Sequence, residues 1–169
     1  VITVNGVAKG FAMTGWRIGF TAAAKWISEG LEKLQGQVTS GTCSIAQKAA
    51  VAAFNGPLDE TRKMTDAYHR RRDLVVGLLK EIPGFRVNVP DGAFYAFPDV
   101  SAYFGKSDGT TTINDSDDFS GWLLNTAHVA TVAGSGFGAP NCIRISTAAS
   151  DEALVEAVGR IKAAVAILG

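Results

Sequence analysis

Cysteine and histidine are scarce in this sequence. Its two cysteines, Cys43 and Cys142, are too few for a disulfide framework, and neither belongs to a CxxC pair. His69 and His128 stand far apart without candidate ligands at a metal-binding spacing. We therefore expect neither a disulfide scaffold nor a metal site.

An excess of charge of one sign and long apolar runs are also lacking. The 16 basic and 16 acidic side chains cancel, so nothing indicates a nucleic-acid partner or an anionic membrane. The only basic run, Arg70–Arg72, lies in a helical pattern and is interpreted as a solvated face. No apolar run reaches membrane-spanning length and no signal-peptide pattern opens the chain, so we expect a cytoplasmic location. The start at Val1 instead of Met indicates a cut through a larger protein.

The order of the expected helices and strands predicts an α/β or α+β chain in two lobes, divided near residue 57. Hydrophobic residues make up 47% of the 169 residues, enough to bury a sizeable core. Alternating apolar residues and turn residues predict strands over 1–4, 18–24, 85–89, 93–97, 129–132 and 142–146. Helical spacing predicts helices over 26–34 and 44–54, and a long exposed helix from about 59 to 82. Two more helices are expected to begin after Asp115 and Ser150. Residues 35–42 are expected to form a loop, and the alanine-rich helix over 44–54 is expected to be buried.

A glycine-rich string, Gly134–Gly138, invites interpretation as a phosphate loop. It lacks a following GK[ST], and a Pro-Asn turn and a strand come after it instead of a helix N-terminus. We therefore do not assign it to phosphate binding.

The stretch over residues 5–20, NGVAKGFAMTGWRIGF, carries the strongest chemical signal. Lys9 stands among small and apolar residues, and a desolvated lysine is a good nucleophile and Schiff-base former. Arg17 has no charged neighbour, and its planar fork of donors suits a phosphate. On composition alone, Lys9 is more simply explained as a surface lysine in a loop, and Arg17 as an ion-pairing or strand-edge arginine. Together, an amine for an aldehyde and a guanidinium for a phosphate indicate a pyridoxal-phosphate site.

Residues 142–146, CIRIS, form the second informative stretch. Because side chains alternate along a strand, Ile143 and Ile145 share one face and Arg144 points to the other. The isoleucines belong to a core, and Arg144 faces either a pocket or solvent.

The string GVAKGFAMTGWRIG resembles the lysine signature of the class I, fold type I, pyridoxal-phosphate-dependent aminotransferases. QVTSGTCSIAQKAA, VPDGAFYAFPD and VATVAGSGFGAPNCIRIS follow in the family's order, and the bacterial type of aspartate aminotransferase is similar over essentially the whole chain. The resemblance implies that Lys9 is the Schiff-base lysine, Arg17 the phosphate arginine and Arg144 the arginine that pairs with the substrate α-carboxylate.

The resemblance also implies the domain organisation and the partners. Residues 1–56 would be the C-terminal remnant of the large cofactor domain, and 57–169 the small C-terminal domain, entered by a long bridging helix. Thr39 and Ser40 match a stretch that reaches the neighbouring subunit's phosphate site, so a homodimer is implied. The substrates would be an amino acid and a 2-oxo acid, with aspartate and 2-oxoglutarate preferred.

Some features of the family are altered or absent. Thr147 stands where a tyrosine is common and Ala133 where proline is frequent, which affects substrate geometry. The family's residues that contact the cofactor ring lie before the lysine, so the isolated chain is expected to be inactive. The alternatives are an aromatic aminotransferase, a C–S lyase of the same fold, or a non-catalytic fragment or assembly module.

Overall fold

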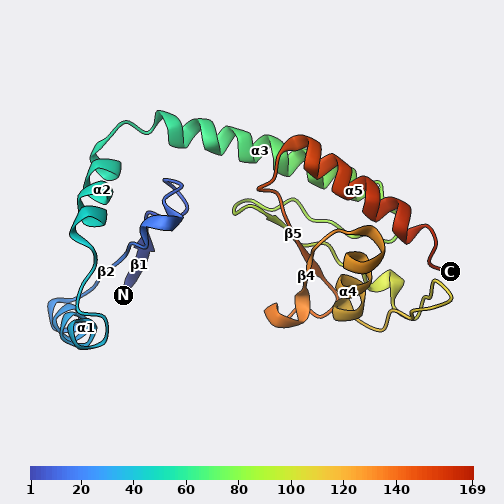
Figure 1. The fold of residues 1–169 in the computed structure, drawn as a ribbon, viewed down its shortest axis with the longest axis horizontal. Coiled ribbons are helices and arrows are strands. Elements are labelled where there is room, and N and C mark those ends of the chain that lie inside the picture. Colours follow the sequence, from blue (N-terminus) through green and yellow to red (C-terminus); the bar gives the residue numbers. More distant parts are fainter. The chain divides into compact units, whose positions relative to one another are not determined.

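The structure, a computed structural model that describes all of residues 1–169, contains two units, Val1–Met64 and Thr65–Gly169. Their boundary lies inside helix α3 (Asp59–Lys80), the long helix expected from the sequence. Helix α3 begins with the acidic residues Asp59 and Glu60, which stabilise its positive N-terminal end. Figure 1 shows the order of the elements along the chain.

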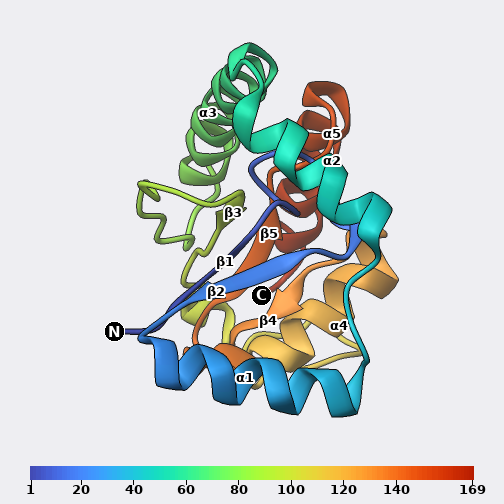
Figure 2. The same ribbon diagram turned by 90° about the vertical axis from the view of Figure 1, so that its left-hand side faces the viewer.

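The first unit starts with a hairpin of two antiparallel strands. Strand β1 (Thr3–Gly6) pairs with β2 (Gly19–Ala22), and the two strands form a sheet by themselves. Figure 2 shows this hairpin as the two blue strands. Both strands expected at this end of the chain exist, although β1 begins two residues later than Val1 and β2 is shorter than 18–24. Each strand of the pair keeps one free edge.

Two helices complete the first unit, and both differ from expectation. Helix α1 (Lys25–Val38) continues through Gln35 and Gln37, which were assigned to a loop. Glutamine is a good helix former, so the polar composition did not end the helix. Helix α2 (Ser44–Asn55) buries only Ala46 and Ala50. The prediction of a buried helix was wrong, since the larger apolar side chains of α2 are exposed: Ile45, Val51 and Phe54.

The second unit is built on a three-stranded antiparallel sheet with the order β3-β5-β4. The strands are β3 (Tyr95–Ala96), β4 (Val132–Ala133) and β5 (Ile143–Ser146). The strand expected over 85–89 is absent: a single bridge joins Arg86 to Asp99, and Val89 is exposed. Proline at position 90 removes one backbone donor, which disfavours a longer ladder there.

Helices cover this sheet as their sequences predict. Helix α4 (Ser116–Ala127) is capped by Asp115, whose carboxylate accepts bonds from the N–H groups of Asp117 and Asp118, each at 2.9 Å. Helix α5 (Asp151–Val165) is capped by Ser150, which accepts from the N–H of Ala153 at 3.3 Å. The expected apolar stripe of the last helix is buried throughout: Leu154, Val158, Ile161, Val165 and Leu168. No helix of the chain is both long and apolar enough to cross a membrane.

Arginines of α3 fasten α5 to it, which corrects the interpretation of Arg70–Arg72 as a solvated face. Arg70 donates to Asp151 from Nε at 3.0 Å and from Nη2 at 3.3 Å, and Arg71 donates from Nε at 3.0 Å. Arg72 donates to the carbonyl of Pro90 at 3.2 Å. Figure 1 shows α5, in red, running alongside the second half of α3. The basic run is therefore a joint between two helices.

We predict that Asp151→Asn destabilises the second unit at neutral pH and loses this effect in acid. Hydrogen bonds from Arg70 and then Arg71 hold the pKa of Asp151 below its ordinary value. Its stabilising effect is therefore complete above the ordinary pKa of about 3.9 and disappears as the pH falls through the lowered native value. Urea unfolding should give a lower midpoint for the variant at pH 7, with a difference that shrinks below roughly pH 5. Asp59→Asn, in an exposed pair, is the control; a pH-independent difference for Asp151→Asn would contradict the prediction.

Candidate functional site

The loop that joins β1 to β2 carries both Lys9 and Arg17. The register pairs Gly6 with Gly19, so residues 7–18 close the hairpin. A Cβ on Gly6 would lie 2.8 Å from the carbonyl oxygen of Ile18, which is too close for any side chain. Glycine at position 6 therefore lets the two ends of the loop approach each other.

Apolar contacts hold this loop against α2. Val7 is fully buried, and Phe11 packs edge-on against Phe54 with ring centroids 5.2 Å apart. Phe20 of β2 contacts the same ring at 5.7 Å. The N–H of Ala12 donates to the carbonyl of Lys9 at 3.1 Å, which forms a turn directly after the lysine. The backbone around Lys9 is thus fixed by the core of the first unit.

Lys9 itself is exposed. We expected the small and apolar neighbours of Lys9 to desolvate its side chain, and this expectation was wrong. Glycine and alanine have side chains too small to cover the stem of a lysine. A Cβ built on the adjacent Gly10 would meet nothing within 4 Å. The backbone next to Lys9 is therefore open to solvent at Gly10.

Arg17 adopts an uncommon backbone conformation. Its φ of 53° and ψ of 50° lie in the left-handed region, which costs a non-glycine residue about 1–2 kcal/mol. The side chain is exposed, its Nη1 donates to the carbonyl of Thr14 at 2.8 Å, and no carboxylate pairs with it. Strain at an arginine with unused donors is typical of a functional position.

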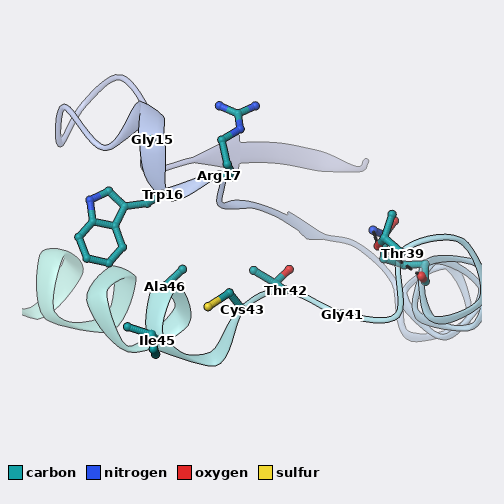
Figure 3. Close-up of a pocket in the computed structure, with 10 residues that line it drawn as sticks. Gly15, Trp16, Arg17, Thr39, Gly41, Thr42, Cys43, Ile45 and Ala46 are labelled. Atoms are coloured by element: carbon teal, nitrogen blue, oxygen red, sulfur yellow. Dashed lines mark hydrogen bonds between the residues drawn. The ribbon is translucent and has the colours of Figure 1, made fainter.

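A cavity of about 690 Å³ opens beside Arg17. Its polar lining comes from Arg17, Gln35, Thr39 and Thr42, and its apolar lining includes Trp16. Figure 3 shows Trp16 extending toward α2, whereas the guanidinium of Arg17 projects away from Thr42. Lys9 is not among the residues that line this cavity. The sequence singled out Arg17 and Thr39 but missed Gln35 and Thr42, which no spacing marked.

Cys43 also lines this cavity, at the N-cap position of α2. Hydrogen bonds from the backbone N–H groups of Ala46 and then Ile45 lower the pKa of its thiol. The first turn of α2 thus favours negative charge at this end of the cavity.

Arg144 lies in the second unit, on the central strand of the sheet. Ile143 and Ile145 are buried on the core side, which confirms the alternation expected for β5, and Arg144 is half-buried on the other side. Its Cζ lies 4.4 Å from the centroid of the Tyr95 ring and 4.7 Å from that of Phe137. No hydrogen bond or ion pair occupies its guanidinium, so all of its N–H donors are available. The sequence did not identify the two rings as partners.

The glycine-rich string, Gly134–Gly138, has a structural role in a turn before β5. It forms a short 3₁₀ turn, η3 (Gly134–Phe137), and Gly134 donates its N–H to the carbonyl of Cys142 at 2.7 Å. A Cβ on Gly134 would lie 2.1 Å from the carbonyl oxygen of Ala139 and 2.5 Å from that of Cys142. The glycine allows the turn to pack against the start of β5, and the turn presents Phe137 to Arg144.

The donors of the first unit suit pyridoxal phosphate. The amine of Lys9 is accessible to an aldehyde, and Arg17 combines unused guanidinium donors with a polar cavity next to it. The chemical types of these two groups, an amine and a guanidinium, therefore match the aldehyde and the phosphate of the cofactor.

The fold is that of the fold type I aminotransferases. The structure superposes on the crystal structure of the aspartate aminotransferase from Rhizobium meliloti with a TM-score of 0.96 and 44% identity, covering 99% of this chain and 42% of that one. Over residues 1–161 the sequence matches the family described as aminotransferase class I and II. The chain belongs to this family.

Curated relatives agree with this assignment. An aspartate aminotransferase from R. meliloti is 46% identical over 164 residues, which are 96% of this chain and 40% of that protein. A bifunctional aspartate aminotransferase and glutamate/aspartate-prephenate aminotransferase from Petunia hybrida is 47% identical over 169 residues, 96% of this chain and 35% of that protein. The chain therefore spans about 40% of the length of such relatives. The family depends on pyridoxal phosphate, which confirms the cofactor expected from the sequence.

Proposed function

We propose that this chain is part of an aminotransferase that moves an amino group between aspartate and 2-oxoglutarate in a ping-pong reaction. The observation that carries the proposal is the hairpin loop over residues 7–18, which holds an accessible lysine and a strained, unpaired arginine in a chain of the aminotransferase family. The names of the relatives, which include aspartate aminotransferases, support the choice of aspartate.

Lys9 is the proposed catalytic residue. Its amine would bind the aldehyde of the cofactor until the substrate's amine takes its place. The freed amine of Lys9 would then move a proton from the substrate's Cα as general base and return one as general acid. Pyridoxal phosphate, when bound, supplies the electron sink that makes this proton acidic. The fixed turn after Lys9 would keep the lysine's backbone in place while its exposed stem moves.

Arg17 is the proposed phosphate ligand. Its guanidinium keeps donors that Thr14 does not use, and no carboxylate pairs with it. The left-handed backbone of Arg17 adds support to a functional role, because strained backbone positions are enriched at binding sites.

Arg144 is the proposed ligand of the substrate α-carboxylate. A planar guanidinium with unoccupied N–H donors binds a carboxylate through two parallel hydrogen bonds. The central position of β5, paired on both sides, supports a well-fixed arginine.

The remaining assignments also belong to this proposal. Residues 1–56 would form the end of the large cofactor domain and residues 57–169 the small domain. A homodimer would bring the Thr39–Ser40 stretch to the partner's phosphate site; the left-handed φ of 66° at Ser40 supports a special role there. We propose a cytoplasmic location. Sedimentation of the full-length protein that carries this chain tests the dimer, and a monomer would contradict it.

We predict that Arg17→Ala weakens binding of pyridoxal phosphate by about 2 kcal/mol or more, the scale expected for losing a charged hydrogen-bonded partner. The measurement is the dissociation constant of the cofactor for the full-length protein, from fluorescence titration. Arg62→Ala, which removes an exposed arginine paired with Asp59, is the matched control and should bind normally. Unchanged affinity in Arg17→Ala would contradict the proposed phosphate contact.

The reaction itself is tested by half-reactions of the full-length protein. Aspartate should convert the bound cofactor to its amine form, and 2-oxoglutarate should restore it. Phenylalanine and cystathionine distinguish an aromatic aminotransferase and a C–S lyase, and a prephenate arm is included because the Petunia relative is named for that activity. Absence of cofactor conversion by aspartate would overturn the proposed substrate. No conversion by any of these compounds would favour a non-catalytic role.

A further inference from the structure

We propose that Tyr95 and Phe137 are positioning residues that cover the faces of the Arg144 guanidinium and leave its edge for a carboxylate. The inference rests on the proposed function of Arg144 and adds what orients that side chain and sets its affinity.

The contacts of Arg144 are with aromatic rings alone. Its Cζ lies 4.4 Å from the Tyr95 centroid and 4.7 Å from the Phe137 centroid, both within the range of a cation–π contact. No ring contact joins Tyr95 to Phe137, so each ring meets the guanidinium separately. No acidic side chain or carbonyl takes up its N–H groups.

The two rings come from different elements of the sheet region. Tyr95 belongs to β3 and is paired with Ser146 of β5, whereas Phe137 ends the η3 turn that precedes β5. Each ring is itself supported: Phe94 contacts Tyr95 with centroids 4.4 Å apart, and Phe97 meets Phe137 edge-on at 6.0 Å. Each ring thus has one further aromatic neighbour besides Arg144.

Phe137 is not part of the hydrophobic core, so packing in the core does not explain a large apolar side chain at this position. Its side chain is 52% exposed, and a large apolar group normally gains most from burial. Contact with Arg144 gives this exposed ring a function.

Covering both faces has a chemical consequence for the ligand. A guanidinium stacked between rings offers its donors only in its own plane, and a carboxylate that lies in this plane accepts two parallel hydrogen bonds. The rings also keep water from the faces, which strengthens the charge interaction at the edge. A lysine or an unstacked arginine at position 144 would lack this selection for a planar anion.

The test compares ligand binding in variants of the full-length holoenzyme. The probe is succinate, a dicarboxylate without an amine, so binding is measured without reaction, alongside KM and kcat for aspartate. Tyr95→Leu and Phe137→Leu should each weaken succinate binding, and raise KM for aspartate, by about threefold to tenfold. The value of kcat should stay nearly unchanged, because the carboxylate contact is the same in the ground state and the transition state. Tyr95→Phe keeps the ring, so its affinity for succinate and its KM for aspartate should stay within about twofold of the wild-type values. Phe104→Leu, at a half-buried phenylalanine of the same unit that does not contact Arg144, is the control.

Arg144→Lys separates this inference from the proposed function. If it abolishes succinate binding while both leucine variants bind normally, the positioning role is wrong and the proposed function stands. If Arg144→Lys binds succinate normally, the proposed carboxylate site itself is wrong.

A measurement on the unaltered protein covers the case in which a leucine variant does not fold. The Nε–H signal of Arg144 in a ¹⁵N NMR spectrum is assigned by its loss in Arg144→Lys. Ring currents should shift it upfield from the other arginine signals. An ordinary shift would overturn the proposal.

Discussion

The Lys9→Ala variant of the full-length protein is expected to lose transamination by at least about 10³-fold, because the proposed role of Lys9 includes both holding the cofactor and moving the proton. The loss should appear in kcat, since no other group in the hairpin loop can take over the proton transfer. Stability should change little, because Lys9 is exposed and the loop is held by Val7 and Phe11. The measurements are steady-state kinetics with aspartate and thermal unfolding.

Covalent labelling gives the direct assignment for the same prediction. Borohydride reduction of the holoenzyme followed by peptide mapping should place the pyridoxyl group on Lys9 alone. Lys25 and Lys33 of α1 provide matched controls: both are exposed, and Lys25 lies 3.7 Å from Glu29. Lys25→Ala and Lys33→Ala should keep full activity. Label on either of them, or normal turnover by Lys9→Ala, would refute the assignment of Lys9.

The 169-residue chain by itself is expected neither to transaminate nor to hold pyridoxal phosphate tightly. Lys9 and Arg17 are both exposed, so nothing in the chain fixes a ring between them. Positioning of a reactant contributes about 7–11 kcal/mol to lowering a barrier, so most of the rate should be lost without the walls of the site. Relatives that are named as active enzymes are more than twice as long as this chain.

Exposed apolar side chains on the first unit also support the prediction that the 169-residue chain is inactive by itself. Helix α1 exposes Trp26 by 75%, Leu34 by 64% and Val38 by 69%, and β1 and β2 each leave an edge open. Apolar helices and free strand edges favour association. The test is the absorbance spectrum of the purified chain with added cofactor, compared with the full-length protein. A stable band of lysine-bound cofactor together with aspartate turnover by the chain alone would contradict the prediction.

The elements with the clearest periodicity were predictable from sequence. Helix α5 combines a serine cap with a five-residue apolar stripe, and β5 alternates isoleucine with arginine, so local pattern and burial agree. The glycine-rich string is followed by a turn and by β5 instead of a helix N-terminus, as the sequence predicted. In these segments the local preference and the tertiary structure favour the same conformation.

Other segments depended on partners that a sequence does not reveal. The alternation of Phe85, Val87 and Val89 is that of a strand, yet only Arg86 finds a bridging residue. The alanine-rich α2 has the composition of a buried helix, yet Ile45 and Phe54 remain exposed. Burial depends on what packs against an element, and this information is not local.

In the candidate site, too, some features were predictable from the sequence and others depended on the folded chain. Lys9, Arg17 and Arg144 were identified by residue type and by resemblance to a family, and their roles remain predictions. The exposure of Lys9 was not foreseen, because apolar neighbours in sequence were taken for neighbours in space. The rings around Arg144 come from separate turns and strands, so only the folded chain brings Tyr95 and Phe137 to it.

The antiparallel register of the two sheets has a consequence for how readily each part of the site opens. Strand β5 is bonded on both sides, so its amides should exchange with solvent only in rare, large openings of the second unit. The β1–β2 hairpin has one ladder and two free edges, and a lone hairpin is only marginally stable. The amides of β1 and β2 should therefore exchange faster than those of β5, even though the packing of Val7 and Phe11 holds the turn beside Lys9 in place.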